Sequence, residues 1–391
     1  MVKPFQFARL PKIYFKTGII VQLPTFVQQY GKKIFVVTGK NSFTSTGSAD
    51  LLFAEFKKKD IDYNILMVHG EPSPETIDNA VVKFNSEKID LVVGIGGGSV
   101  IDAGKAISAM MYRQESVFDF LEGVGKKEHP GTKIPYIAVP TTSGTGSEAT
   151  KNAVISCVGK EGFKRSLRHD NFVPDVALID PGLTLNCPAK ITAASGMDCF
   201  TQLTEAFLSD KSNEYTDALA QEGLKSIKAS LINSYQDGEN IEARTGMSFA
   251  ALTSGICLAN AGLGVVHGFA SSVGGMFDIP HGLICGTLMA KSNQINVREL
   301  RNRGNNPAAL KKYALLGKLF LGKNKLTDNQ YIDGFIEYLY QLAEKLQLTG
   351  LHNLGFDEKD IESICLRTEC KNNPVLLTTE NLQEILISSL N

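Results

Sequence analysis

Short apolar runs alternate with longer amphipathic stretches over the first half of the chain. The intervening stretches 48–59 and 74–87 place their apolar residues at helical spacing. The apolar runs are rich in β-branched residues and cover 34–37, 63–68, 91–95, 136–139 and 176–179. Continuously apolar strands separated by helices are typical of a parallel sheet covered on both faces. The pattern therefore predicts an α/β domain over residues 1–187.

The pattern changes at a turn-rich link that contains Pro181 and Pro188. Beyond it we expect helices only, covering 189–209, 213–234, 240–260, 263–276, 282–295, 307–320, 327–347, 357–370 and 379–390. The chain has 391 residues, and this length favours two domains. The second domain is thus predicted to be all-α over 188–391. A cleft between two such halves is a common place for a cofactor to meet a substrate.

The charge balance narrows the class of partner. Forty basic and 41 acidic residues give a net charge of −1, which is no electrostatic footprint for nucleic acid or an anionic membrane. No apolar run has the length of a membrane span, and the first residues lack the apolar core of a signal peptide. Seven scattered cysteines without a Cys-x-x-Cys pair favour reduced thiols. We expect a cytoplasmic protein with a small-molecule partner.

Two loops that each follow a predicted strand indicate a nucleotide site. The first, Gly96-Gly97-Gly98-Ser99, opens a helix, and its glycines let a diphosphate approach the exposed amides of the helix N-terminus. Ile101 stands where the G-x-G-x-x-G fingerprint has its last glycine, so a plain strand-to-helix turn explains this loop equally well. The second loop, 140–148, is dense in hydroxyls and glycines that suit phosphate or ribose oxygens. Together the two loops favour the nucleotide interpretation.

A metal site is indicated farther along the chain. Asp198 and Gln202 stand four residues apart on one face of a predicted helix, in apolar surroundings where a carboxylate needs a partner. With the imidazoles of His267 and His281 they form a plausible four-ligand set for Fe²⁺ or Zn²⁺, and Glu205 lies one turn beyond as an outer acceptor. Two alternatives stay open: Gln202 as a buried amide bonded to Asp198 without metal, and His267 as a core histidine.

The remaining cysteines and histidines have simpler interpretations. Cys199 and Cys285 flank the candidate ligands, and both are predicted to be small core residues rather than thiolate ligands. The other histidines lie in segments expected to be exposed loops: His69, His129, His169 and His352.

Taken in order, five motifs resemble the iron-containing (group III) alcohol dehydrogenase family: Gly96–Asp102, Thr141–Glu148, Gly196–Glu205, 265–270 (Val-Val-His-Gly-Phe-Ala) and 280–282 (Pro-His-Gly). The resemblance spans nearly the whole chain. It implies a dinucleotide-binding N-terminal domain, a helical metal-binding C-terminal domain, and NAD(P)-dependent interconversion of an alcohol with its aldehyde or ketone. It also implies a homodimer or higher homo-oligomer.

The resemblance also implies site residues. Those expected at the cofactor, NADP(H) or NAD(H), are Gly39, Lys40, Asn41, Gly97, Gly98, Ser99, Asp102, Thr141, Thr142, Thr145, Asn152, Lys164 and Leu183. Those expected at Fe²⁺ or Zn²⁺ are Asp198, Gln202, His267 and His281. Two departures stand out: Gln202 replaces a histidine, so weaker metal binding is expected, and Ser271 replaces a second histidine. His267 and Ser271 are the candidate catalytic residues.

The segment after the first predicted core strand bears on cofactor choice. No acidic residue follows that strand until Asp50, whereas NAD-specific sites generally place a carboxylate there for the ribose hydroxyl. In the family a glycine at the position of Gly39 goes with tolerance of a 2′-phosphate, and Lys40 would pair with that group. The sequence therefore predicts that NADP(H) is accepted.

Two other functions remain as alternatives. The superfamily includes enzymes of phosphorylated substrates, such as dehydroquinate synthase, a lyase, and glycerol-1-phosphate dehydrogenase. These need cationic clamps, and Arg244 is the one Lys or Arg in the segment 240–285 expected to line the substrate side. The third interpretation is a non-catalytic nucleotide-binding protein.

Overall fold

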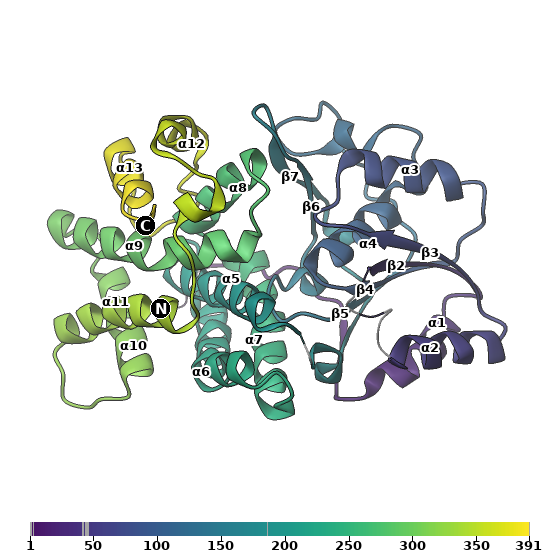
Figure 1. Cartoon of the computed structure of the whole chain (residues 1–391), viewed down its shortest axis with the longest axis horizontal. Coiled ribbons are helices and arrows are strands. Elements are labelled where there is room, and N and C mark those ends of the chain that lie inside the picture. Colours follow the sequence, from purple (N-terminus) through teal and green to yellow (C-terminus); the bar gives the residue numbers. More distant parts are fainter. Residues whose placement is uncertain (1, 3, 41–42, 44–46, 186, 391) are drawn as a thin grey trace.

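The computed structural model describes residues 2, 4–40, 43, 47–185 and 187–390, and its two halves differ in secondary structure. A sheet flanked by helices forms one side of the molecule, and a group of helices forms the other (Figure 1). The predicted order, an α/β domain followed by a helical domain, is confirmed.

The sheet has six parallel strands in the order β1-β8-β5-β4-β2-β3. Its strands are β1 Lys12–Phe15, β2 Lys33–Gly39, β3 Asp62–Val68, β4 Leu91–Gly96, β5 Tyr136–Pro140 and β8 Val176–Ile179. The five predicted strands are all present. The edge strand β1 was missed because it is only four residues long and none of these residues is fully buried.

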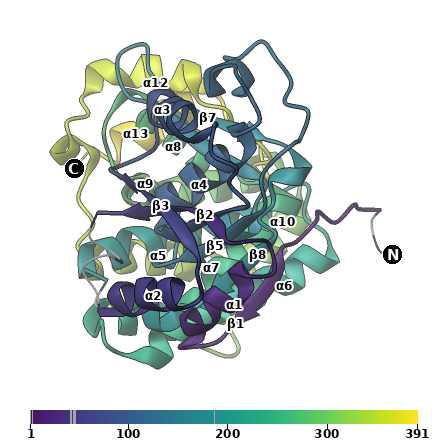
Figure 2. The same cartoon turned by 90° about the vertical axis from the view of Figure 1, so that its right-hand side faces the viewer.

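Alternate residues of the central strand β2 face two different cores. Phe35 and Val37 pack on the side of α3 (Pro74–Phe84) and α4 (Gly98–Met110). Ile34 and Val36 pack on the opposite side, with α1 (Leu23–Val27) and α2 (Gly47–Lys58). Figures 1 and 2 show these two helix pairs on opposite faces of the sheet. Burial on both faces explains why the strand reads as continuously apolar.

The chain order around β2 creates a crevice. From β2 the chain passes to β3 on one side, and it then returns to form β4 on the other side. Thr38 of β2 is in register with Ile95 of β4, so both strands end at the same edge. Ligands of open α/β sheets bind at such a switch point, beyond the carboxyl ends of the strands.

The second half is helical, as predicted, and no strand occurs over 188–390. Its helices are α5 Ala189–Leu208, α6 Glu214–Gln236, α7 Ile241–Ala261, α8 Val265–Met276, α9 His281–Arg303, α10 Pro307–Leu321, α11 Asp328–Lys345, α12 Ile361–Arg367 and α13 Thr379–Ile387. α9 runs past the predicted end at 295, and it stops where Gly304 adopts the left-handed conformation (φ 62°). α5 is buried along most of its length in the middle of the helices.

One described pair of helices has the overall length and apolarity of a membrane span. α7 and α8 meet that test only when taken together, and they are bent by 99° at their junction; no single helix of the described chain meets it alone.

The two halves touch through backbone at glycines. Gly146, in the loop after β5, has φ 61°, and a Cβ there would lie 2.5 Å from the backbone of Gly255 on α7. Ser143 Oγ of the same loop lies 3.2 Å from Ser248 Oγ of α7. Side chains at either glycine would push the halves apart, so this loop is fixed on the helical domain.

A β-hairpin that the sequence did not predict forms a second contact. β6 (Asn152–Cys157) and β7 (Phe163–Arg168) pair antiparallel, and a Cβ at Gly162 near the tip would lie 2.1 Å from the Gly275 carbonyl oxygen on α8. The hairpin was missed because β7 carries three cations in six residues and lacks an apolar alternation.

Candidate metal and nucleotide site

Four potential ligand atoms converge among α5, α8 and α9. They belong to Asp198, His267, His281 and Cys285, and all lie within 4.8 Å of one another. Asp198 Oδ1 is 3.1 Å from His267 Nε2 and 3.8 Å from His281 Nε2. The structure thus brings together three of the four predicted metal ligands from three helices, and it adds Cys285.

Close packing of α9 against α5 places this cluster. A Cβ at Gly282 would lie 2.1 Å from the Ala194 carbonyl oxygen and 3.2 Å from Asp198 Cβ. The helices can approach this closely only because position 282 has no side chain. His281 and Cys285, four residues apart at the start of α9, consequently face Asp198 from one side of the helix.

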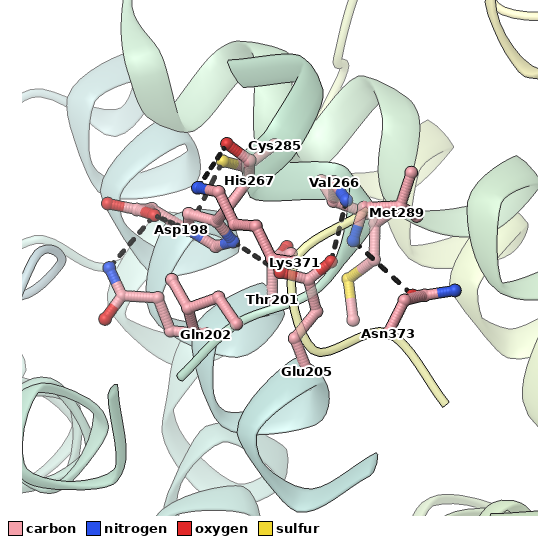
Figure 3. Close-up of polar contacts among 12 residues, drawn as sticks. Asp198, Thr201, Gln202, Glu205, Val266, His267, Cys285, Met289, Lys371 and Asn373 are labelled. Carbon is pink, nitrogen blue, oxygen red and sulfur yellow. Dashed lines mark hydrogen bonds and ion pairs between the residues drawn. The ribbon is translucent and has the colours of Figure 1, made fainter. Parts of the chain in front are cut away.

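Glu205 orients the ring of His267. Its Oε2 is 2.7 Å from His267 Nδ1, and its Oε1 accepts a hydrogen bond of 2.7 Å from the backbone N–H of Val266. Figure 3 shows the imidazole between Asp198 and Glu205. A carboxylate on Nδ1 fixes the ring and turns Nε2 toward the cluster, which is how ligating histidines are commonly held. The predicted position of Glu205 is confirmed.

Electrostatics in the cluster follow from this arrangement. Burial alone would raise the pKa of Asp198, but the two histidines and a hydrogen bond from Gln202 hold it at about 2. Burial likewise opposes charge on His267, yet Cys285, Asp198 and Glu205 around its ring raise its pKa well above the ordinary value. Burial and the nearby Lys164 ammonium lower the pKa of His281 to about 3, so this ring is neutral. The buried carboxylates of the cluster therefore favour a cation beside them, and an Asp and two His are donors that suit Fe²⁺ or Zn²⁺.

Gln202 makes contacts that match the non-metal alternative. Its Nε2 donates to Asp198 Oδ1 at 3.1 Å, and its Oε1 lies 3.1 Å from Ser254 Oγ. Ser254 Oγ is in turn 3.5 Å from the carbonyl oxygen of Gly144, in the loop after β5. The amide oxygen of Gln202 faces Ser254 rather than the cluster, and only turning the amide over would present it to a metal. Gln202 thus connects Asp198 with the loop after β5.

Cys285 is the site residue that sequence reasoning assigned to the core. Its side chain is buried as expected, but its Sγ lies 3.7 Å from His267 Nε2 (Figure 3). The overlooked signal is its spacing of four residues from His281, the same spacing that singled out Asp198 and Gln202. Cys199, by contrast, lies in the hydrophobic core as predicted.

The first glycine-rich loop has the features of an anion site. Gly97 caps α4 without a side-chain hydrogen bond, so the first amides of the helix lack a side-chain cap. A Cβ at Gly98 would lie 2.5 Å from Thr145 Cγ2, which shows how closely the two loops approach. Thr141 Oγ1 is buried and has no hydrogen-bond partner within the described chain. Uncapped amides and an unpartnered buried hydroxyl at one sheet edge fit a dinucleotide.

The same loops are joined by a buried polar network that the sequence did not reveal. Lys105 Nζ donates to Ser147 O at 2.8 Å and to Asn152 O at 2.6 Å. Ser147 Oγ also donates to Asp102, which was predicted to contact the cofactor but lies inside the protein. Burial lowers the Lys105 pKa to about 8, and Asp102 counteracts that shift. The sequence feature that could have indicated this network is a Lys three residues after Asp102 on an otherwise apolar helix.

The other predicted cofactor residues are spread around this edge. Gly39 ends β2, where it is buried, and Lys40 follows as an exposed residue. On the β6–β7 hairpin, Asn152 Oδ1 accepts a hydrogen bond from Arg168 Nε at 3.1 Å. The remaining positions are Ser99 and Thr142 in the two loops, Lys164 in an ion pair with Glu71, and half-buried Leu183 in η5 Pro181–Thr184. Asn41 lies outside the described residues.

Ser271, the second candidate catalytic residue, stands one turn after His267 on α8. Its Oγ donates to the His267 carbonyl oxygen at 2.9 Å. Lys371 Nζ donates to the same oxygen at 2.9 Å, and it lies 3.5 Å from Ser271 Oγ. The hydroxyl is half-buried and borders a cation that sequence reasoning did not connect with the site.

One histidine prediction is wrong. His69 and His352 are exposed and His169 is half-buried, but His129 is 8% exposed and packs edge-on between Phe120 and Phe172. Burial lowers its pKa to about 4. Glycine, proline and charge around His129 indicated a loop, and that loop folds back over the core.

Comparison with known proteins gives consistent matches over the whole chain. The NADPH-dependent butanol dehydrogenase of Clostridium saccharobutylicum is 31% identical over 358 residues, which are 90% of this chain and 88% of the relative. The NAD-dependent methanol dehydrogenase of Bacillus methanolicus is 28% identical over 388 residues, 95% of this chain and 96% of the relative. The solved structure of an alcohol dehydrogenase from Oenococcus oeni superposes with a TM-score of 0.88 at 28% identity, covering 99% of this chain and 100% of that one.

Two family patterns divide the chain between them. The pattern described as "Iron-containing alcohol dehydrogenase" matches residues 11–181, and "Fe-containing alcohol dehydrogenase family, C-terminal" matches residues 192–390. Together with a metal-type cluster between the helices and phosphate-type loops on the sheet, they establish that the chain belongs to the iron-containing alcohol dehydrogenase family.

Proposed function

We propose that the protein is an NAD(P)-dependent alcohol dehydrogenase or aldehyde reductase, interconverting a small alcohol with its aldehyde or ketone. The observation that carries this proposal is the link from the cluster to the nucleotide loop: Asp198 contacts Gln202, whose amide reaches Ser254 beside Gly144. A cation site built into the same contact as a dinucleotide loop suits a reaction between a nicotinamide and a polarised carbonyl. The names of the relatives support simple primary alcohols as substrates.

Asp198, His267 and His281 would hold the divalent metal, Fe²⁺ or Zn²⁺, with Gln202 as the fourth ligand expected from its position. The metal would polarise the substrate oxygen, and the nicotinamide would supply or accept the hydride. Glu205 keeps His267 Nε2 directed at the cluster. Gln202 holds the carboxylate of Asp198 in place and therefore contributes even where its oxygen does not coordinate.

Binding and proton transfer fall to residues around the cluster. The amides of Gly98 and Ser99 at the start of α4, with Thr141 Oγ1, would bind the diphosphate. Gly39 and Lys40 would accommodate a 2′-phosphate beyond β2. The remaining cofactor contacts of this proposal are Asn41, Gly97, Thr142, Thr145, Asn152, Lys164 and Leu183. Asp102 would act indirectly, by holding Ser147 of the second loop.

Ser271 would pass a proton in this reaction. Its hydroxyl donates to the His267 carbonyl oxygen and lies 3.5 Å from Lys371 Nζ, so the ammonium would replace a proton that leaves it. His267 would take part in catalysis through its place in the cluster, where its Nε2 contacts Asp198.

The structure is less suited to binding a phosphorylated substrate. Arg244, the cation expected on the substrate side, is 3% exposed, and its guanidinium donates to Gly238 O, Thr192 Oγ1 and Cys187 O. These hydrogen bonds hold the start of α5, and they leave no pair of guanidinium donors free to bind a phosphate.

Nicotinamide absorbance tests the proposal. Metal-supplemented protein should oxidise NADPH with a panel of simple aldehydes, and Asp198→Asn should lose that turnover. Turnover confined to phosphorylated substrates would support the superfamily alternative. Cofactor binding without turnover on any substrate would support the non-catalytic one.

Assembly, location and domain limits complete the proposal. We expect a homodimer or higher homo-oligomer with no nucleic-acid or membrane partner. All seven cysteines are free thiols, which supports the reducing cytoplasm. The boundary between the dinucleotide domain and the metal domain is placed at 187/188, immediately before α5 begins at Ala189.

A further inference from the structure

We propose that Cys285, rather than Gln202, is the fourth protein ligand of the metal. This inference rests on the proposed metal site and deepens it, because it replaces an oxygen donor by a thiolate. The two residues approach the cluster from different helices: Gln202 from α5 and Cys285 from α9.

The four candidate donor atoms lie close enough together to surround one metal ion. The donors of Asp198, His267, His281 and Cys285 lie within 4.8 Å of one another, and Sγ is 3.7 Å from His267 Nε2. Ligand atoms around a tetrahedral Zn²⁺ stand about 3.3–3.6 Å apart, from bonds of about 2.0 Å to nitrogen and 2.3 Å to sulfur. A small contraction of the cluster therefore produces a four-coordinate site.

Close packing of α9 against α5 holds these donor atoms in place. Gly282 and Gly286 flank the cysteine on α9, and a Cβ at Gly286 would lie 3.0 Å from Met197 Cβ on α5. His281 and Cys285 are thus fixed against α5 at the level of Asp198. Cys285 is 0% exposed, and its sulfur faces the cluster at 3.7 Å from His267 Nε2.

Gln202 is already engaged at both ends of its amide. Its Nε2 donates to Asp198 Oδ1, and its Oε1 faces Ser254 Oγ. Coordination through Oε1 would require turning the amide, and that would give up the hydrogen bond that Asp198 now accepts. Cys285 needs no such exchange, since within the described chain the hydrogen-bond contact of its sulfur is with His267 Nε2 alone.

The chemistry of the thiol sets the expected metal. On binding, the S–H bond of Cys285 breaks, its proton leaves to solvent, and the sulfur donates an electron pair to the metal without any redox change. Asp198 and the thiolate together would neutralise a divalent cation. Thiolate and imidazole ligands favour Zn²⁺, so this chain should prefer zinc over iron more strongly than a site of one carboxylate and three imidazoles.

Cobalt substitution tests the ligand directly, without reference to turnover. Cofactor-free protein is stripped of metal and titrated with Co²⁺, and absorption is recorded for wild type, Cys285→Ser, Cys285→Ala, Gln202→Leu and Cys199→Ser. Cys199 is the matched control, because it is equally buried and directly follows Asp198 in the chain. Near-ultraviolet circular dichroism establishes that each variant is folded.

We expect a sulfur-to-cobalt charge-transfer band in the near ultraviolet for wild type, Cys199→Ser and Gln202→Leu, and its loss in both Cys285 variants. Zn²⁺ affinity of Cys285→Ser should fall at least about 100-fold, beyond what loss of an outer partner costs. Cobalt binding to wild type without that band would overturn the thiolate ligand and leave the metal site standing. Absence of any cobalt binding would overturn the metal site itself, and the inference with it. The wild-type spectrum alone decides between these results if a Cys285 variant does not fold.

Discussion

Gln202 Nε2 donates a hydrogen bond of 3.1 Å to Asp198 Oδ1, one turn earlier on the buried helix α5. This contact makes the amide a support for the carboxylate at the position where the family usually has an imidazole. It also explains how a residue that is a poor donor to Fe²⁺ or Zn²⁺ can occupy the site without leaving Asp198 unpartnered.

Gln202→His should raise the metal content of the purified protein. An imidazole at this position adds a donor that Fe²⁺ and Zn²⁺ bind more strongly than an amide oxygen. Elemental analysis after identical purification and supplementation measures the change, and Gln221→His on the exposed side of α6 is the matched control. Equal metal content in Gln202→His and wild type would contradict the position assigned to residue 202.

Gly39→Asp should shift cofactor preference from NADP(H) toward NAD(H). Gly39 ends β2 at the crevice, where a carboxylate would repel a 2′-phosphate and accept a hydrogen bond from a ribose 2′-hydroxyl. The ratio of kcat/KM for NADPH to that for NADH should fall roughly tenfold or more, which corresponds to about 1.4 kcal/mol. An unchanged ratio would show that the ribose binds elsewhere.

Gly282→Ala should damage the metal site through helix packing alone. The new Cβ would lie 2.1 Å from the Ala194 carbonyl oxygen, so α9 must move away from α5 and carry His281 with it. Overpacking of this kind costs about 1–3 kcal/mol. Urea unfolding and metal content should both fall. Gly47→Ala, at a helical position with open space around it, should leave both unchanged; normal metal binding by Gly282→Ala would refute the packing argument.

His129 should make the protein less stable as the pH falls from 7 to 5. Its folded pKa of about 4 lies below the ordinary value of 6.5, so the unfolded chain binds the extra proton and stability is lost through this window. The loss from this residue is about 2 kcal/mol at pH 5.

The variant His129→Asn isolates that contribution. An Asn oxygen can accept the hydrogen bond that Gly131 N–H now donates to His129 Nδ1, but it does not titrate. Chemical unfolding at pH 7 and pH 5 should therefore show a smaller difference for the variant. An identical difference in both proteins would place the pH dependence elsewhere.

Periodicity predicted the architecture because buried parallel strands and amphipathic helices carry strong local signals. Phe35 and Val37 face one core while Ile34 and Val36 face the other, so β2 was apolar throughout and easily found. The hairpin of β6 and β7 was not found from the sequence, because Lys164 and Arg168 form ion pairs with partners far away in the sequence. Its strands form through tertiary contacts rather than local preference.

The candidate site was predictable to the extent that its residues share a helix face. Asp198, Gln202 and Glu205 were found this way, and the family motifs supplied His267 and His281. Cys285 was not singled out, because most free cysteines are simply buried in the core. Only the packing of α9 on α5 turns its sulfur toward Asp198. Lys371 and Glu71 lie far from the motifs in sequence and left no local signal.

Hydride transfer between a nicotinamide and a carbonyl at the Asp198 cluster can be followed directly with an isotope label. NADPH carrying deuterium at both C4 positions is incubated with butanal and metal-supplemented protein, and the butanol is analysed by mass spectrometry. Wild type should give butanol with one deuterium on C1, whereas folded Asp198→Asn should give none. Folded, metal-loaded wild-type protein that yields no deuterated butanol, or that yields as much as Asp198→Asn does, would contradict the account.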